Sequence, residues 1–285
     1  MAVAVSLINM KGGVGKTTLA AQLAHAADRR KLRTLAIDLD PQSNLSQALL
    51  SPEKYVKMLK QKPTVAALFE QYLPPSDFSS SPKPVDVQDV ILKKAGYWSS
   101  TTLDLIPSRL ELAHTLKNPT GKERRLARAL SKVADEYDLI LIDCAPTESI
   151  LTEAAYHASR YVLVPVKPEF LATIGLPLLA RSIREFKYEN SDHELDICGI
   201  VFNHSSTYSD GPEGATSVNE VEAEARKHGW RVFGTHVRYS ASYPKAAREG
   251  TPIANTSYVR WEVTNEFSRF VEEFLESVGL SKGKS

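Results

Sequence analysis

The sequence predicts an α/β fold, a single domain built on a mostly parallel, twisted sheet with helices on both faces. Short, wholly apolar segments alternate along the chain with helix-like segments, as expected when crossover helices join parallel strands. A glycine-rich loop separates the first apolar segment from the first helix-like segment. Two further apolar segments end in aspartate, which places carboxylates at the sheet edge where α/β proteins bind ligands.

The predicted strands are continuous apolar runs, which suit a sheet that is covered on both faces. In chain order they span residues 4–8, 34–38, 103–106, 139–143, 161–166 and 197–202, with a shorter strand at 230–233. Near the C-terminus, apolar residues recur at helical spacing between Val263 and Val278, which predicts a helix packed on the core.

The loop after the first predicted strand has the composition of a phosphate-binding loop, which makes the fold a P-loop NTPase domain. Its glycines let backbone N–H groups turn inward around phosphate oxygens, and the N-terminus of the following helix adds a favourable dipole. We expect Lys16 to neutralise the β- and γ-phosphates of a nucleotide and the Thr17 hydroxyl to hold Mg²⁺. The residues predicted to contact the nucleotide here are Lys11, Gly12, Gly13, Val14, Gly15, Lys16, Thr17 and Thr18.

Two acidic motifs follow the loop in the expected order. Asp38 and Asp40 are separated by one residue at the end of an apolar strand, so both can face the same side. Asp143 ends the apolar strand 139–143, and both Asp38 and Asp143 are predicted to hold Mg²⁺. Phosphoryl transfer asks mainly for positioning and charge neutralisation, so one carboxylate suffices to position the attacking water. The alternative at Asp40 is a helix cap or a turn with Pro41.

One P-loop ATPase domain is predicted over residues 1–280, because the sequence shows no internal repeat and no convincing boundary. Residues 51–102 are predicted to be an insertion between strands, with an exposed Pro/Ser-rich loop near 74–87. Residues 204–217 are predicted to form a second, mobile loop, and residues 281–285 a disordered tail.

Composition excludes several classes of protein. Of the 285 residues, 42% are hydrophobic and 24% are charged, which is ordinary for a soluble globular protein. No stretch approaches the ~18 consecutive apolar residues of a membrane-spanning helix. The two cysteines, Cys144 and Cys198, are too few for a disulfide framework and suit the reducing cytoplasm, which is the expected location.

The net charge of +1 conceals a basic segment. Between residues 226 and 260, seven basic residues stand against the single acid Glu249, a local net charge of +6. A local basic surface indicates an anionic partner, and contacts from lysine and arginine to phosphate dominate DNA binding. A second basic cluster, at residues 122–128, is interpreted as a solvated helix face. The predicted DNA contacts are Arg226, Arg231, Arg238, Lys245 and Arg248.

The phosphate loop departs from the common motif, because Met10 stands where glycine is usual and a second lysine, Lys11, opens the loop. This combination resembles the deviant Walker A motif of the ParA/MinD family of ATPases, and the resemblance extends over nearly the whole chain. It implies that Lys11 reaches across a dimer interface to the partner's nucleotide and that Asp40 orients the attacking water. It also implies a Walker B role for Asp143 and an adenine contact for Asn203. The implied catalytic residues are Lys11, Lys16 and Asp40.

Proteins of the ParA type bind ATP and Mg²⁺, close into a sandwich homodimer and then bind DNA without sequence preference. The resemblance therefore implies a nucleoid-associated ATPase that positions or segregates a chromosome, a plasmid or a protein complex. Hydrolysis would be slow unless a cargo-bound protein stimulates it, and it would release the dimer from DNA. Because the phosphate loop lies so close to residue 1, an N-terminal DNA-reading domain is not expected.

The main alternative is a MinD-like positioning ATPase on a membrane, which would need a C-terminal amphipathic helix with a basic polar face. The polar positions of the predicted C-terminal helix are mostly glutamate, which anionic lipid repels. An iron–sulfur reductase would need two well-placed cysteines per subunit. A tyrosine kinase relative would need a tyrosine-rich tail, whereas the last tyrosine is Tyr258. A further alternative is a regulator that binds ATP without hydrolysing it.

Overall fold

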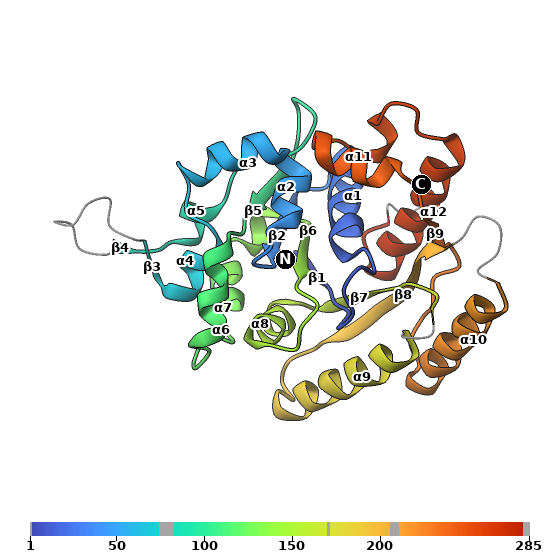
Figure 1. The fold of residues 1–285 in the computed structure, drawn as a ribbon. Helices are drawn as coiled ribbons and strands as arrows, with labels where there is room; N and C mark the ends of the chain where they lie inside the picture. Colours follow the sequence, from blue (N-terminus) through green and yellow to red (C-terminus); the bar gives the residue numbers. More distant parts are fainter. Residues whose placement is uncertain (1, 74–82, 170–171, 206–210, 282–285) are drawn as a thin grey trace.

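The computed structural model describes residues 2–73, 83–169, 172–205 and 211–281. Its main sheet has seven strands in the order β5-β2-β6-β1-β7-β8-β9, and neighbouring strands run parallel (Figure 1). The strands are β1 (Val3–Leu7), β2 (Thr34–Leu39), β5 (Leu103–Ile106), β6 (Leu139–Cys144), β7 (Tyr161–Val166), β8 (Asp196–Ser205) and β9 (Val237–Arg238). The predicted α/β fold is confirmed, and the strand that leads to the phosphate loop is central.

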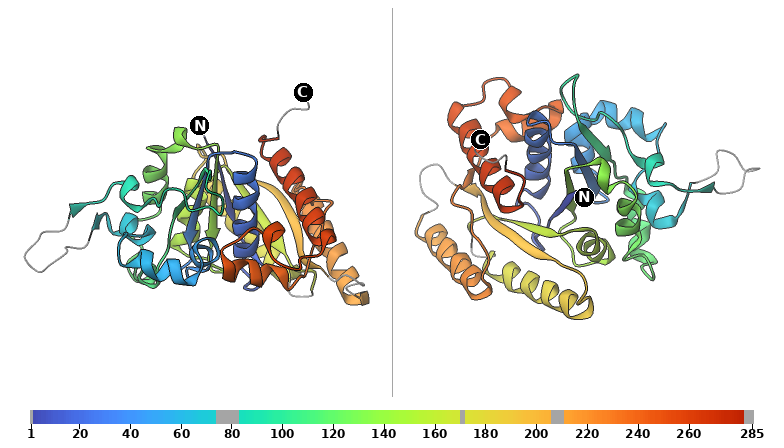
Figure 2. Two further views of the ribbon diagram at one scale, coloured as in Figure 1. Left: turned by 90° about the horizontal axis from the view of Figure 1, so that it is seen from above. Right: turned by 180° about the vertical axis from the view of Figure 1, so that it is seen from behind.

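Helices cover both faces of the sheet because side chains alternate along each strand between two hydrophobic clusters. On β6, Leu139 and Leu141 belong to one cluster, and Ile140 and Ile142 belong to the other. The first cluster is closed by α1 (Lys16–Arg29) and α12 (Trp261–Ser277). The second is closed by α8 (Ile150–Ala158), α9 (Ala172–Glu189) and α10 (Gly211–His228), on the other side of the sheet in Figures 1 and 2.

Shorter helices line the edges of the sheet and the loops. They are α2 (Asn44–Leu50), α3 (Pro52–Leu59), α4 (Val65–Glu70), α5 (Val87–Val90), α6 (His114–Lys117), α7 (Arg125–Ser131) and α11 (Ser242–Glu249). Three 3₁₀ turns are η1 (Leu110–Ala113), η2 (Ala134–Glu136) and η3 (Ile253–Asn255). Of these, α2 and α11 matter most for the site, because both pack against α1, the helix that follows the phosphate loop.

The predicted insertion lies between β2 and β5 and carries α3, α4 and α5. A small antiparallel ribbon, β3 (Tyr72–Leu73) with β4 (Lys83–Pro84), projects beside it (Figure 1). Of the loop predicted near 74–87, residues 74–82 lie outside the described residues, and the exposed β4 occupies part of the remainder. The limits of the insertion and of the domain stay predictions.

The strand predicted at 230–233 is wrong. Among the described residues of this stretch, Val232 pairs with the sheet through a single bridge to Ile200, and the edge strand β9 comes later. The carboxylate of Glu273 on α12 accepts a hydrogen bond from the backbone N–H of Gly234 (2.7 Å). Phe233 still donates its backbone N–H to Ile200 of β8 (2.9 Å), and directly after it the chain turns to α12, so its pairing with the sheet stops at this bridge.

The loop predicted at 204–217 is wrong at both ends. β8 continues to Ser205 and α10 begins at Gly211, so regular structure flanks residues 206–210. Pro212 favoured a loop in the sequence, but it occupies the first turn of α10, where a proline removes no helical hydrogen bond. Residues 206–210 lie outside the described residues, as do residues 282–285 of the predicted tail.

The predicted C-terminal helix is confirmed as α12. Its apolar side chains, among them Phe267, Phe270 and Phe274, are buried in the cluster shared with α1. Across the described ranges, no helix combines the length and the apolar character that crossing a membrane requires.

Candidate functional site

The glycine-rich loop joins the end of β1 to the start of α1, as predicted. Gly13 and Gly15 have φ angles of 75° and 87°, a left-handed conformation that glycine adopts without strain. At Gly15, a Cβ atom would also collide with the side chain of Asn203. The loop ends at the N-terminus of α1, where backbone N–H groups and the helix dipole favour a phosphate.

Lys16 is the first residue of α1, and its side chain folds back onto the loop. Its Nζ donates hydrogen bonds to the carbonyl oxygens of Asn9 (3.0 Å) and Lys11 (3.1 Å). Burial lowers the pKa of this ammonium, and the charge of Asp143 opposes that shift. The predicted phosphate-neutralising cation therefore lies between the glycine-rich loop and the acidic end of β6.

Asp38 and Asp143 lie side by side at the carboxyl edge of the sheet. They are register partners on the neighbouring strands β2 and β6, and both are fully buried. Burial raises the pKa of Asp38 to about 7. Burial and the neighbouring charge of Asp38 raise the pKa of Asp143 well above its usual range. Among the described residues, neither carboxylate oxygen of Asp143 has a hydrogen-bond partner.

The Asp38 carboxylate is held by α2. Its Oδ2 accepts hydrogen bonds from both the backbone N–H and the hydroxyl of Ser46, each at 2.7 Å. The Ser46 hydroxyl oxygen in turn accepts the backbone N–H of Ser108 (2.9 Å), in the loop after β5. Sequence reasoning missed Ser46, because a serine inside a short helix carries no signal until the fold places it beside β2.

Asp40 follows β2 and is close to Asp38. Its backbone N–H donates a hydrogen bond to Oδ1 of Asp38 (3.2 Å), and its own Oδ1 accepts the backbone N–H of Gln42 (2.9 Å). This second contact is an Asx turn, so Asp40 does form the turn that was the alternative to a catalytic role. It leaves the other carboxylate oxygen, Oδ2, without a partner among the described residues, so the water-orienting role stays a prediction.

The oxygen groups at this edge fit a hard cation such as Mg²⁺. Asp143 offers a buried carboxylate without a hydrogen-bond partner, Asp38 lies in register beside it, and the Thr17 hydroxyl lies close enough to affect the pKa of Asp143. No group of three histidine, cysteine or acidic side chains in the described part of the chain is arranged to hold a metal. Magnesium would therefore need water and phosphate oxygens as further ligands, which is its usual preference.

Lys11 is paired within its own chain. Its Nζ donates a hydrogen bond to Oε1 of Glu169, in the segment after β7. The other carboxylate oxygen of Glu169 lies 2.9 Å from Nζ of Lys167. These two cations hold the pKa of Glu169 below its usual range, with the hydrogen bond from Lys11 as the largest cause. Sequence reasoning assigned Lys11 to a partner subunit and missed this intrachain partner.

Asn203 lies in β8 and reaches the phosphate loop. It is buried, and its Nδ2 donates a hydrogen bond to the carbonyl oxygen of Val14 (2.8 Å). The side chain thus ties β8 to the loop, while the adenine contact stays a prediction.

The five predicted DNA contacts are distributed over the end of α10, the segment after it, β9 and α11. Arg238 forms an ion pair with the buried Glu266 (2.8 Å), so much of the positive charge of Arg238 is neutralised within the protein. Weaker pairs join Arg226 to Glu222 (3.6 Å) at the end of α10 and Arg231 to Glu276 (3.3 Å) on α12. By contrast, the described residues offer no acidic partner to the two candidates on α11, Lys245 and Arg248.

The second basic cluster is only partly the solvated helix face that the sequence indicated, because Arg124 and Arg128 are exposed but the other two members are held within the protein. Lys122 is buried and pairs with Glu70 of α4 (2.8 Å), and Arg125 donates a hydrogen bond to the carbonyl oxygen of Phe69. These contacts attach the insertion to α7, which gives part of the cluster a structural role.

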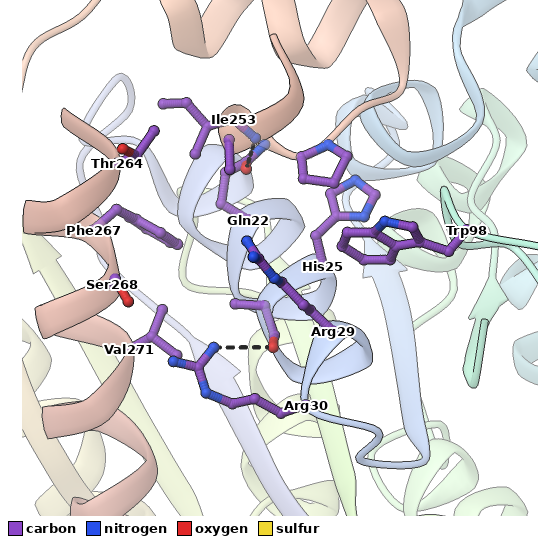
Figure 3. A pocket seen from close by; sticks show the side chains of 13 residues that line it. Gln22, His25, Arg29, Arg30, Trp98, Ile253, Thr264, Phe267, Ser268 and Val271 are labelled. Atoms are coloured by element: carbon purple, nitrogen blue, oxygen red, sulfur yellow. Dashed lines mark hydrogen bonds between the residues drawn. The ribbon is translucent and has the colours of Figure 1, made fainter. Parts of the chain in front are cut away.

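A separate pocket lies further along α1, away from the glycine-rich loop (Figure 3). It is lined by residues of α1, the segment around Trp98, the η3 turn and α12, and by none of the predicted site residues. His25 lines it, is almost completely buried, and has no hydrogen-bond partner for either ring nitrogen among the described residues. Burial lowers the pKa of His25 to about 4, so the ring is neutral at neutral pH.

Comparison with known proteins agrees with this geometry. A family model described as an AAA domain matches residues 2–197. The chain is 34% identical over 197 residues to the chromosome partitioning protein ParA of Myxococcus xanthus, covering 69% of this chain and 63% of that protein. It is 29% identical over 250 residues to the sporulation initiation inhibitor protein Soj of Bacillus subtilis, covering 87% of this chain and 89% of that protein.

Solved structures show the same fold. An ATP complex of a McdA variant from Cyanothece superposes with a TM-score of 0.77, covering 100% of this chain and 99% of that one. The two sequences are 19% identical, so this likeness shows the fold alone.

Proposed function

Because the chain belongs to the AAA-domain family and is a P-loop ATPase of the ParA type, we propose that it is an ATP-dependent dimerising ATPase that binds DNA and positions a cargo. The cargo would be a chromosome, a plasmid or a protein complex, and the DNA would be bound without sequence preference. The observation that carries the proposal is that Lys11 and Lys16 share one glycine-rich loop beside the paired carboxylates of Asp38 and Asp143.

Each residue of the site has a chemical role that its position supports. Lys16 would neutralise the β- and γ-phosphates of ATP, and Thr17, Asp38 and Asp143 would hold Mg²⁺ directly or through water. Bound Mg²⁺ would stabilise the charge that develops on the phosphate oxygens. The free Oδ2 of Asp40 would orient the attacking water. The other proposed nucleotide contacts are Lys11, Gly12, Gly13, Val14, Gly15, Thr18 and Asn203.

Dimerisation would depend on Lys11. To reach the nucleotide of a second copy, Lys11 must exchange the carboxylate of Glu169 for the γ-phosphate of that nucleotide. Both are anions, so the exchange replaces one ion pair by another instead of leaving the lysine unpaired. The proposed sandwich homodimer would form with ATP and separate after hydrolysis, when the γ-phosphate that Lys11 contacts is lost.

DNA binding would come mainly from α11. Lys245 and Arg248 lie on a helix that packs against α1 and α2, next to the glycine-rich loop, and Arg248 lines the same hollow as Thr17 and Thr18. Repeated binding and release on the nucleoid would move the cargo, and a cargo-bound protein would accelerate hydrolysis. The stimulating protein and the cytoplasmic, nucleoid-associated location are part of the proposal.

The test measures binding to a random-sequence DNA duplex with ATP and Mg²⁺, with ADP, and without nucleotide, at two salt concentrations. We expect salt-sensitive binding with ATP alone, and its loss in Lys11→Ala together with the loss of ATP-dependent dimers. An ATP-dependent dimer that binds no DNA in any state would contradict the DNA part of the proposal and bring membrane or protein partners forward.

Hydrolysis is tested separately with Asp40→Ala. We expect this variant to retain ATP-dependent dimerisation and to lose phosphate release, because Asp40 would act on the attacking water and not on ATP binding. An unchanged rate of phosphate release would contradict the role proposed for Asp40. A wild-type protein that binds ATP and releases no phosphate would instead support a regulator that does not hydrolyse ATP.

A MinD-like membrane ATPase has less support. Its C-terminal helix would need an apolar face free for lipid, whereas Phe267, Phe270 and Phe274 of α12 are buried in the core. The exposed positions of α12 include Glu262 and Glu272, which anionic lipid would repel.

A further inference from the structure

The segment that joins η3 to α12 displays two aromatic side chains to solvent. Tyr258 is 97% exposed and Trp261, the first residue of α12, is 72% exposed. Neither ring belongs to a hydrophobic cluster of the core. Burial in the fold therefore does not explain why one short segment carries two large rings.

The backbone under the rings is held in place. Tyr258 has a φ of 61°, a left-handed conformation that costs a bulky residue free energy unless its surroundings impose it. The buried Thr256 donates hydrogen bonds from its backbone N–H to the carbonyl oxygen of Ile253 (3.1 Å) and from its hydroxyl to that of Pro252 (3.3 Å). The exposed rings therefore follow a turn whose backbone is held by hydrogen bonds.

The same turn is attached to the helix of the phosphate loop. The side chain of Gln22 on α1 accepts the backbone N–H of Ile253 (2.7 Å) and donates to the carbonyl oxygen of Thr251 (3.5 Å). At Gly250, a Cβ atom would crowd the backbone of Ser51, so α11 ends in close contact with the junction of α2 and α3. The two rings therefore follow a turn that α1, the helix after the phosphate loop, holds in place.

A basic side chain contacts one of the rings, and two further exposed cations stand on the same segment or on the preceding helix. Nζ of Lys245 lies 5.5 Å from the centroid of the Tyr258 ring and also donates a hydrogen bond to Ser257. Arg248 and Arg260 are exposed, and the described residues provide neither with an ion-pair partner. Proteins that bind single strands combine aromatic rings that stack on bases with cations that bind phosphates, and proteins that bind duplexes can insert apolar side chains between base steps.

The segment from residue 242 to residue 262 contains fewer acidic than basic residues. Between residues 242 and 262, Glu249 and Glu262 stand against three basic residues, so the stretch keeps a positive charge. Glu262 lies in the first turn of α12, where a negative charge stabilises the helix.

We propose that Tyr258 and Trp261 contact nucleobases when the protein binds DNA. They would form, with the neighbouring cations, one surface that reads no sequence but touches bases as well as phosphates. This inference rests on the proposed DNA-binding function and adds a second kind of contact to it. We call this surface the aromatic–basic surface, and it consists of Lys245, Arg248, Tyr258, Arg260 and Trp261.

A lipid surface is the other partner that aromatic and basic residues suit, and it fits this surface less well. Membrane-binding helices pair such rings with a broad exposed aliphatic face. Around Tyr258 and Trp261, the described segment instead buries Ile253 and Val263. Two isolated rings offer little area to a membrane but enough to stack on or wedge between bases.

The experiment compares two polyanions, a random-sequence DNA duplex and inorganic polyphosphate, with the full chain in ATP and Mg²⁺. The variant is Tyr258→Asn with Trp261→Ala, because asparagine tolerates the left-handed backbone and should not unfold the turn. We expect its affinity for DNA to fall about 5- to 100-fold, with an unchanged salt dependence and an unchanged affinity for polyphosphate.

Two control variants separate the contribution of the rings from that of the phosphate contacts. Tyr188→Asn removes a ring that is 89% exposed on α9, outside the aromatic–basic surface, and should leave DNA binding unchanged. Lys245→Ala should weaken binding to both polyanions and reduce the salt slope by about 1, as loss of a phosphate contact does.

The wild-type measurement tests the proposed function, and the variants test this inference. If the wild type binds DNA with ATP and the double variant binds equally well, the rings contact no bases and the inference is overturned. An equal loss of affinity for DNA and for polyphosphate would also overturn it. So would binding to phosphatidylglycerol vesicles that depends on the two rings, because it would assign the surface to a membrane.

Discussion

The ammonium of Lys11 and the carboxylate of Glu169 form an ion pair within a single chain. Lys11 opens the glycine-rich loop, and Glu169 follows the neighbouring strand β7, so the pair connects the phosphate loop to the sheet's carboxyl edge. The lysine that is proposed to contact the nucleotide of a second subunit is thus paired with an acidic residue of its own chain in the monomer. Dimerisation must compete with this ion pair.

Glu169→Gln should favour the dimer. Both side chains of the ion pair are partly exposed, so each pair is worth up to about 1 kcal/mol, and because a symmetric dimer breaks two pairs the dissociation constant should fall about 2- to 30-fold. Sedimentation velocity with ATP and Mg²⁺ measures this constant. Glu194→Gln, which removes an exposed partner of Arg160, is the control and should have no effect. A weaker dimer in Glu169→Gln would mean that Glu169 itself contributes to the interface.

Ser46→Ala should destabilise the protein through Asp38. The variant removes a hydroxyl that donates to a buried carboxylate, which costs about 1–3 kcal/mol of unfolding free energy. Urea denaturation without nucleotide measures the change. Ser131→Ala, which removes a hydroxyl from the exposed face of α7, should stay within about 0.5 kcal/mol of the wild type. Equal stabilities of the two variants would contradict the role of Ser46.

Asp143→Asn should stabilise the protein without nucleotide while it removes the response to Mg²⁺. Folding raises the pKa of Asp143, so the wild type loses stability as pH rises above about 4, the ordinary pKa of an aspartate. Asparagine carries no charge to bury, and its advantage should therefore grow with pH over that range. Thermal unfolding at several pH values, with and without MgADP, checks both parts. A variant that MgADP stabilises as strongly as it does the wild type would contradict a metal-holding role.

His25→Phe should remove part of the acid sensitivity of the fold. Burial lowers the pKa of His25 to about 4, so between pH 6.5 and 4 the unfolded chain binds a proton that the folded chain does not. The wild type should lose up to about 3 kcal/mol over this interval as pH falls. Because both ring nitrogens lack partners in the described residues, phenylalanine should be tolerated near pH 7. Urea denaturation of both proteins at pH 7 and pH 4.5 tests this, and parallel losses would contradict it.

The sequence was informative where function depends on a local motif. The glycine-rich loop, the aspartates that end β2 and β6, and the apolar stripe of α12 were all predicted, because each depends on residues adjacent in the chain or at regular spacing. Asp38 and Asp143 could be expected at one edge, since parallel strands end there together. Their register pairing required the strand order, which the sequence does not contain.

Contacts between distant segments could not be predicted. Glu169 is 158 residues from Lys11, and no pattern in the sequence connects them. Counting charge along residues 226–260 made Arg238 a candidate for DNA contact, because Glu266 lies outside that window and is brought to it by α12. The pairing at 230–233 is likewise limited to one bridge, and Glu273 of α12, distant in the sequence, takes the N–H of Gly234 directly after it.

The central position of β1 has a consequence for biosynthesis. Leu7 pairs with Asp143 on one side and with Leu163 on the other, so β1 has no neighbour until β6 has left the ribosome and only one until β7 follows. Closing loops of this length is slow, and an unpaired apolar strand is prone to aggregate while it waits. β1 is therefore synthesised well before it can be placed in the sheet. A nascent chain would acquire its phosphate loop only after β6 and β7 have been translated.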